Sequence, residues 1–444
     1  MPVRSSRPSL KALTLAVATT TAGLSLNAQA SQGNIADTYG LMPLDVGSAQ
    51  GFSMFNPNVA ATYYNPAYLV KDPRAELTGG IFHGRHELEA SGPDRNGDVL
   101  SDSPTQHVLA GFKADAMALT RFDHPVYIGV IAGIEKFSRE LLSFNSETSS
   151  QGQFFQYDRQ PLFLNIGGGT TLWRGLSGGF ATRITLQNEA ALTTSTSLGG
   201  QTQYEKLSVE AKPSIRSILS ANLDWEETFC PDRSCWLDGF ETAVTYRATS
   251  STRTKVYANT SIPGLLPPNQ PLEFTISTLD SFQPSILSVA FQYRSRNWRA
   301  ALTVEQQNWT DLEEEFEGDS IRDQANIQFK DIIVPRLAAQ YQLGSLGFIA
   351  GVAWQESALE SDSTLDVNYF DNDKIIAGVG FTMDINNPGF FSYPIQLGIA
   401  YQYQHLMERD FTISTSDPDA TNDGVEVSTE GSVDVLNGSV TFKF

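Results

Sequence analysis

The chain has 444 residues, of which 50 are acidic and 30 basic, so its net charge is −20. A surface this acidic disfavours binding of nucleic acid, which depends on basic contacts to phosphate. After the N-terminal 30 residues, no stretch reaches the roughly 18 consecutive apolar residues of a membrane-spanning helix. The length suits two or three soluble domains or one large barrel.

Residues 1–30 have the features of an export signal. A basic start is followed by a largely apolar run over residues 12–26 and by the small-residue cleavage site Ala28-Gln29-Ala30. The apolar run is shorter than the roughly 20 residues that span a bilayer, which favours a cleaved signal peptide over a membrane anchor. We therefore predict a mature chain that begins at Ser31.

Residues 31–73 differ in pattern from everything that follows. They contain Gly, Asn and Pro with short apolar clusters, and they show little alternation of apolar and polar positions. We expect this segment to be a separate N-terminal domain.

Residues 74–444 alternate between apolar and polar positions. A clear example is Ile395, Leu397, Ile399, Tyr401 and Tyr403, which are separated by Gln, Gly and Ala. Because strand side chains alternate between faces, such a segment has one apolar face and one small, polar face. The pattern predicts about fourteen strands, at residues 74–89, 105–121, 126–138, 153–171, 175–190, 206–226, 238–256, 283–295, 298–316, 328–343, 347–361, 373–386, 394–412 and 432–444.

A soluble sandwich would also alternate, with its apolar face turned inward. Three features favour a membrane barrel instead. The polar face is rich in Gln, Ser, Thr and Gly, aromatic residues such as Tyr293 and Trp298 lie near strand ends, and short breaks alternate with long ones. We predict an all-β fold, an antiparallel transmembrane β-barrel of about fourteen strands over residues 74–444. Such a barrel encloses more space than its own side chains fill, so residues 31–73 are expected to plug it as a hatch.

An even number of strands returns the C-terminus to the side where the chain enters, which we take as periplasmic together with the N-terminal segment. Cys230 and Cys235 then fall in a periplasmic turn, where an oxidising environment favours a disulfide, with free thiols as the alternative. Two cysteines are too few for a closed zinc site. The sequence shows no other metal-ligand pattern and no catalytic signature, so we expect no metal, no cofactor and no enzymatic activity.

The predicted plug contains a recognisable motif. Residues 51–67 read Gly-Phe-Ser-Met-Phe-Asn-Pro-Asn-Val-Ala-Ala-Thr-Tyr-Tyr-Asn-Pro-Ala and end on Asn65-Pro66-Ala67. This stretch resembles the N-terminal hatch of the outer-membrane long-chain fatty acid transporter family, the FadL/TodX type. Later segments are similar in the same order, namely Phe282-Gln283-Pro284-Ser285, Trp309-Thr310 and Phe329-Lys330-Asp331.

The resemblance implies a fourteen-stranded barrel that moves hydrophobic molecules across the bacterial outer membrane by passive diffusion, with lateral release through a kink in the third strand. An apolar path suits this task, because each CH₂ group prefers an apolar environment by roughly 0.8 kcal/mol. The resemblance also implies that Phe444, at the end of the last strand, is recognised by the barrel-insertion machinery. The other expected partners are outer-membrane lipids and lipopolysaccharide, and we expect a monomer.

Several residues are candidates for contact with the substrate. Phe52, Met54 and Phe55 are expected to line the plug side of the pocket, with plain packing against the wall as the alternative. Leu265 and Leu266 lie in an apolar stretch of the long connection 257–282, where we predict substrate capture or packing over the barrel mouth. Asn65, Pro66 and Ala67 are expected to end and anchor the hatch, since Asn and Pro set turns.

Other residues are candidates for the gate and for charge recognition. Gly129 and Gly133 lie where the third strand would kink, although Gly also serves close packing. Arg183, Arg216 and Arg336 lie within strands and could bind a carboxylate, or could form structural ion pairs.

The leading interpretation is uptake of long-chain fatty acids. The sequence does not separate these from alkanes, aromatics or oxidised lipids, and it also leaves open the export of lipid products, a lipolytic enzyme that uses His405, and an adhesive or structural barrel.

Overall fold

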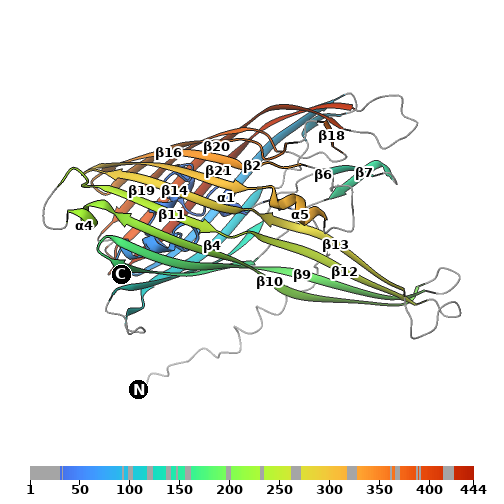
Figure 1. Ribbon diagram of the computed structural model, residues 1–444, viewed down its shortest axis with the longest axis horizontal. Helices are drawn as coiled ribbons and strands as arrows, with labels where there is room; N and C mark the ends of the chain where they lie inside the picture. Colours follow the sequence, from blue (N-terminus) through green and yellow to red (C-terminus); the bar gives the residue numbers. More distant parts are fainter. Residues whose placement is uncertain are drawn as a thin grey trace, which may run out of the picture.

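The alternating segments pair with one another in chain order and close into an antiparallel barrel of fourteen strands, seen in the computed structural model in Figure 1. The structure describes residues 31–32, 34–92, 95–98, 104–117, 124–136, 142–146, 149–155, 162–196, 202–230, 235–261, 272–317, 328–360, 363–365, 371–386, 389, 392–413 and 425–444. The predicted signal peptide and the residues Leu265 and Leu266 lie outside these ranges.

Each wall strand pairs with its sequence neighbour, and the last strand pairs with the first, Leu77 lying opposite Phe442. The wall strands are β2 (Glu76–Gly92), β4 (Thr105–Asp115), β5 (Val126–Lys136), β8 (Leu162–Trp173), β9 (Leu176–Thr196), β10 (Thr202–Asp224), β11 (Phe240–Arg247), β14 (Ser285–Arg294), β15 (Trp298–Asn308), β16 (Ile332–Leu343), β17 (Leu346–Gln355), β19 (Lys374–Ile385), β20 (Ile395–Ile413) and β21 (Val425–Lys443). The fold class predicted from the sequence is confirmed.

The two faces of the wall differ in chemistry. In β4, the buried Leu109 and Lys113 alternate with the exposed Val108 and Phe112. The outside is apolar around the barrel, with Ile81 63% and Ile333 61% exposed. A continuous apolar exterior of this kind is unfavourable in water, so the wall faces lipid.

The wall strands end in tight turns at one end of the barrel and in long hairpins at the other (Figure 1). We call these the short-turn end and the long-hairpin end. The short-turn end carries the turn at residues 174–175, the C-terminus and helix α4 (Trp225–Phe229). At the opposite end β9 and β10 continue beyond the wall beside the hairpin of β12 (Ser250–Ser261) and β13 (Leu272–Gln283).

The long-hairpin end corrects several predicted boundaries. Residues 191–196 and 202–205, which were predicted to belong to a connection between strands, continue β9 and β10, and the described parts of 257–282 belong to β12 and β13. The predicted strand 298–316 ends at Asn308 and is followed by helix α5 (Asp311–Glu317), whose Leu and Glu residues favour helix and whose acidic first turn suits a helix start. Alternation alone could not separate lipid-facing strand from hairpin that extends past the membrane.

The smaller elements complete the description. They are β1 (Ser31–Gln32), β3 (Arg95–Asp98), β6 (Leu142–Ser146), β7 (Ser149–Phe155) and β18 (Ser363–Leu365). β6 and β7 form a separate hairpin, so the wall strand predicted at 153–171 begins only at Leu162. No helix among the described residues is long and apolar enough to cross a membrane.

Residues 34–72, which we call the inner segment, lie inside the barrel, where they appear as blue helices in Figure 1. Their helices are α1 (Ile35–Thr38), α2 (Pro43–Gly47), η2 (Ser53–Phe55), α3 (Ala61–Tyr64) and η3 (Pro66–Lys71). Just before the segment, Ser31 pairs with Ser281 of β13, near the long-hairpin end. Just after it, Ala75 pairs with Phe444 at the short-turn end. The segment therefore crosses the lumen from one end to the other, and only its last residues lie at the short-turn end, which the sequence predicts to be periplasmic.

Candidate functional site

The inner segment is buried along almost its whole length, including polar residues such as Asn34, Asp45 and Asn65. Local signals define its helices: Pro43 occupies the first turn of α2, and the Asn34 side chain accepts a hydrogen bond from the backbone N–H of Asp37 at 2.8 Å. Helices of this length are not stable alone in water. Their conformation therefore depends on contacts with the wall.

Glycines in the wall let the backbone of the inner segment approach closely. A Cβ atom at Gly351 would lie 2.0 Å from the Ser48 carbonyl oxygen, and one at Gly378 would lie 2.4 Å from the carbonyl oxygen of Val46. No side chain other than hydrogen fits at these positions. Sequence reasoning missed this complementarity, although the repeated Gly on the inward face of several strands was a visible signal.

The Asn65-Pro66-Ala67 motif lies against a second glycine surface. Cβ atoms at Gly169 and Gly179 would lie 2.2 Å from the Pro66 carbonyl oxygen and from the Ala67 nitrogen. The Asn65 side chain donates to the Met54 carbonyl at 2.7 Å, and the Ala67 N–H donates to the Ser220 hydroxyl of β10 at 2.8 Å. The motif thus links two parts of the inner segment and joins them to the wall.

Phe52, Met54 and Phe55 are fully buried, and they pack together against small wall residues such as Ala301 and Ala338. The guanidinium of Arg299 lies 4.4 Å from the centre of the Phe52 ring. In this conformation the three side chains make packing contacts with the wall, which was the alternative to pocket lining.

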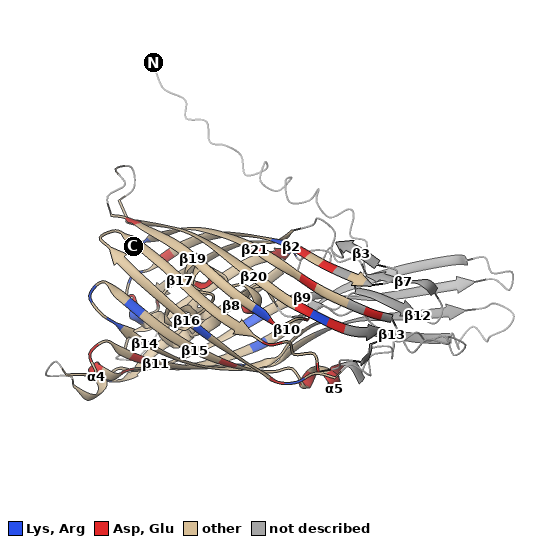
Figure 2. Ribbon diagram, turned by 90° about the horizontal axis from the view of Figure 1, so that it is seen from above, with Lys and Arg blue, Asp and Glu red and all other residues tan. Residues whose placement is uncertain are grey.

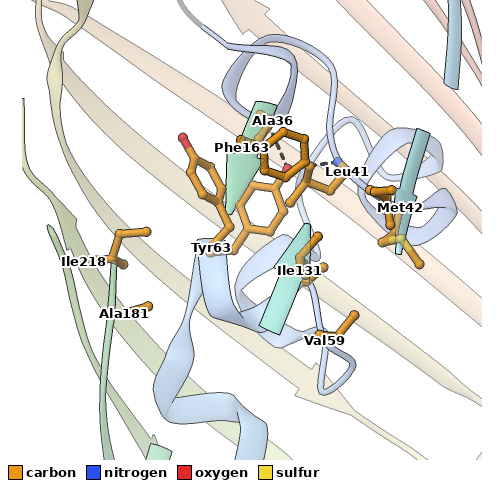
Figure 3. Packing of buried hydrophobic residues seen from close by; sticks show 12 residues of the cluster. Ala36, Leu41, Met42, Val59, Tyr63, Ile131, Phe163, Ala181 and Ile218 are labelled. Atoms are coloured by element: carbon orange, nitrogen blue, oxygen red, sulfur yellow. Dashed lines mark hydrogen bonds between the residues drawn. The ribbon is translucent and has the colours of Figure 1, made fainter. Parts of the chain in front are cut away.

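A further cluster joins the inner segment to β4, β5, β8, β9 and β10. Figure 3 shows Tyr63 and Phe163 close together, with Ile131, Ala181 and Ile218 facing them from the wall. The hydroxyl of Tyr64 accepts from the Leu41 N–H at 3.1 Å and donates to the Ala36 carbonyl at 2.8 Å. These hydrogen bonds tie α3 to the first turns of the segment.

Buried charges form a network between the inner segment and the wall. The Asp37 carboxylate accepts from Arg216 at 2.6 Å and lies 3.7 Å from Arg247, which also binds Glu305 at 2.6 Å. Burial alone would raise the pKa of Asp37, but the two guanidinium groups outweigh burial and hold this pKa at about 2. Arg336 completes the network at 2.9 Å from Glu305.

The candidate cations Arg183, Arg216 and Arg336 all point inward and are buried. Each is paired with a carboxylate, and the partner of Arg183 is Glu135 at 2.8 Å. Structural pairing, the alternative weighed for these residues, describes all three in this conformation.

The predicted gate in the third strand is not present in the described residues of β5. This strand pairs with β4 and with β8 without a register shift through both Gly129 and Gly133. A Cβ atom at Gly129 would lie 2.5 Å from Thr62, and one at Gly133 would lie 2.7 Å from the Phe163 ring. Close packing accounts for both glycines in this conformation, and a lateral gate in this strand stays a prediction.

An apolar cluster lies between the first turns of the inner segment and the wall. Ile35 and Tyr39 pack with Phe82 and Leu88 of β2 and with residues of β20 and β21, among them Leu406, Val433 and Val435. The Tyr39 hydroxyl shares a hydrogen bond of 2.8 Å with the ring of His86. Leu88 and Leu406 are only 8% exposed. This cluster is the apolar surface of the inner segment that lies nearer the long-hairpin end.

Other predicted residues are distributed as follows. The Cys230 and Cys235 sulfur atoms are bonded to each other in the turn after α4, at the short-turn end. His405 is exposed on the outer face of β20. Among the described residues no group of acidic, His or Cys side chains could hold a metal ion.

A lipid-facing, closed antiparallel wall that contains a tightly packed N-terminal segment defines an outer-membrane β-barrel with a filled lumen. No protein-family model matches the chain. Alkane uptake protein A of Marinobacter nauticus is 47% identical over 449 residues, in an alignment that covers 100% of this chain and 98% of that protein.

Solved structures share the fold at low sequence identity. A Pseudomonas aeruginosa FadL homologue matches with a TM-score of 0.56 and 11% identity over 90% of this chain and 98% of its own. The Pseudomonas putida toluene transporter TodX matches with a TM-score of 0.53 and 12% identity over 92% and 99% of the two chains. The chain belongs to the FadL-type family of outer-membrane transporters, and its location is the bacterial outer membrane.

Proposed function

We propose that this protein takes up hydrophobic small molecules across the outer membrane and that alkanes are its main substrates. The observation that carries the proposal is the full-length similarity to alkane uptake protein A, at 47% identity. The sequence by itself had favoured long-chain fatty acids, and the relative moves the substrate class toward neutral hydrocarbons.

The charges inside the barrel support a neutral substrate. Each of the four fully buried arginines of the described wall, Arg183, Arg216, Arg247 and Arg336, is already paired with a carboxylate. A fatty carboxylate beside these four arginines would have to displace one of their partners or remain unpaired, and an unpaired buried charge is strongly unfavourable. An alkane meets no such barrier.

The apolar surfaces on both sides of the inner segment support a path for such a substrate. The cluster around Ile35, Tyr39 and Leu88 lies nearer the long-hairpin end, and the cluster around Tyr63 and Phe163 lies deeper. Transfer from water to such surfaces favours a hydrocarbon by roughly 0.8 kcal/mol per CH₂ group.

The inner segment fills the lumen, so passage requires part of it to move. We infer that it acts as a hatch: a substrate that binds better to a displaced segment shifts the population toward the displaced state.

The test is an uptake assay with the full chain expressed in a bacterium that lacks its own long-chain fatty acid transporter. Cells receive radiolabelled hexadecane or oleate, each below its solubility limit, with an empty-vector strain as control. We expect hexadecane uptake to rise several-fold over the control and oleate uptake to rise less. Equal stimulation of both would remove the preference for alkanes, and no stimulation of either would remove the transport proposal.

A further inference from the structure

A cavity of about 300 Å³ lies at the short-turn end of the barrel, between the inner segment and the wall. Its inner side is formed by Met42–Leu44 and Asn56–Asn58, and its outer side by the β14–β15 turn and by β16, β19, β20 and β21. The turn residues Arg296 and Asn297 are exposed, so the cavity opens to solvent at the short-turn end. The sequence predicts that this end of the barrel is periplasmic. The volume is at the lower end of the range for small-molecule sites.

The lining of this cavity is basic, although the chain as a whole is acidic. Arg294, Arg296, Arg299 and Lys443 line it, and no Asp or Glu is among the lining residues. Arg294 is paired with Glu241 and Lys443 with Asp72, at 2.6 and 3.3 Å. Within the described part of the chain, no carboxylate forms an ion pair with Arg296 or Arg299. Two guanidinium groups at the cavity are therefore available to an anionic ligand.

Arg299 is held in place by neutral groups only. Its Nε donates to the Gln340 side chain at 2.7 Å, one terminal nitrogen donates to the Phe55 carbonyl at 3.1 Å, and its guanidinium lies over the Phe52 ring. A guanidinium has five N–H donors in a planar fork, so several remain for a ligand. This fork matches the two oxygens of a carboxylate or phosphate.

The remaining lining is partly apolar. Met42, Pro43, Leu44 and Pro57 of the inner segment line the same space as the basic groups. A site that combines available cations with apolar side chains is complementary to an amphiphile with an anionic head group. A fully hydrophobic molecule would leave the guanidinium of Arg299 unpaired, and a small inorganic anion would leave the apolar side chains without contacts.

We propose that this cavity binds the anionic head group of an amphiphile at the periplasmic mouth, with Arg299 as the main contact and the alkyl chain beside Leu44 and Pro57. The site goes beyond the proposed function, because an alkane carries no charge. The head group can come from a fatty carboxylate or from a phospholipid phosphate, and the two sources share the same recognition by Arg299.

The test uses the purified full-length protein in an uncharged detergent. Decanoate, decyl phosphate and decanol are titrated into the protein by isothermal titration calorimetry. The Arg299→Gln variant, titrated in the same way, identifies the heat that comes from this cavity, because partition into the detergent is common to both proteins. The three probes have the same chain length, so their partition into detergent is comparable and the head group is the main variable.

We expect both anionic probes to bind with at least tenfold higher affinity than the alcohol, and this difference to shrink at high salt. Arg299→Gln should weaken binding of the anions about tenfold, because a charge-assisted hydrogen bond is lost, while Arg299→Lys should retain part of the affinity. The matched control is Arg174→Gln, at an exposed residue of another short turn that does not line the cavity.

Equal affinity for decanol and decanoate, or equal affinity in the Arg299→Gln and Arg174→Gln variants, would overturn the proposal. Tighter binding of decyl phosphate would assign the site to phospholipid, and tighter binding of decanoate would assign it to fatty carboxylates. Binding is measured without transport, so this result is independent of the hydrocarbon uptake assay.

Discussion

The wall and the inner segment of this barrel are specified in different ways. Each wall strand carries its own alternation of apolar and polar side chains and pairs with its neighbours in chain order. The inner segment consists of short helices that are defined by contacts with glycines and charges far away in the sequence. The wall is the more autonomous structure, and the inner segment depends on it. Outside these two regions, the short helices α4 and α5 carry acidic residues and lie at the two ends of the barrel, as Figure 2 shows.

Breaking the charge contact between the two regions should have the largest effect. Asp37→Asn leaves Arg216 and Arg247 with less compensation in a buried site, and we expect a loss of about 3–5 kcal/mol of stability in the inner segment. The measurement is protection of residues 34–72 from protease in the folded barrel. Protection equal to that of the wild type would show that this contact does not hold the segment.

The pH dependence should be the next largest effect. Burial raises the pKa of Asp45 to about 6, although hydrogen bonds from the Met42 backbone and the Asn56 side chain act in the opposite direction. Because the folded chain holds this proton more tightly than the unfolded chain, stability should fall as pH rises from 3.8 to about 6, by roughly 3 kcal/mol, and the loss should be complete above that pH.

The Asp45 prediction is checked by denaturant unfolding across this window. Asp45→Asn should remove the fall in unfolding free energy with rising pH. If the variant shows the same pH dependence as the wild type, other groups cause it. Asp37 acts in the opposite sense: because its pKa is lowered to about 2, its contribution to stability is lost as pH falls from the ordinary value of 3.8 to about 2.

Glycine substitutions test how closely the inner segment packs against the inward face of the wall, with the outward face as the control. Gly351→Val should displace α2 and the turn after it, since a Cβ atom would lie 2.0 Å from Ser48, at a cost of about 1–3 kcal/mol or more. Gly79→Val is the matched control, because nothing lies within 4 Å of a Cβ there. We expect higher single-channel conductance in Gly351→Val only. Equal conductance in the two variants would contradict close packing of the inner segment.

Removal of an exposed ion pair near the long-hairpin end should have the smallest effect on stability. Lys330 and Glu356 are 3.4 Å apart and about half exposed. Lys330→Gln should change stability by less than about 1 kcal/mol, since solvent screens such pairs. A loss as large as that of Asp37→Asn would mean that burial does not separate the two kinds of ion pair.

The sequence alone determined the wall and the family. Period-two alternation, as in Ile395–Tyr403, depends only on local side-chain geometry, so it placed all fourteen wall strands to within several residues. The Asn65-Pro66-Ala67 motif was sufficient to mark the inner segment. Where alternation continued past the membrane, as in β12 and β13, the boundary could not be predicted, because the same pattern suits both environments.

Only the tertiary structure decided how the inner segment runs, which charges pair and where a cavity remains. The direction from Ser31 to Asp72 depends on contacts with strands hundreds of residues later, such as the pair Ser31–Ser281. The pairing of Arg216 with Asp37, and the lack of a carboxylate partner for Arg299 among the described residues, are set by barrel closure. Closure fixes which inward side chains meet, and a one-dimensional pattern does not contain that information.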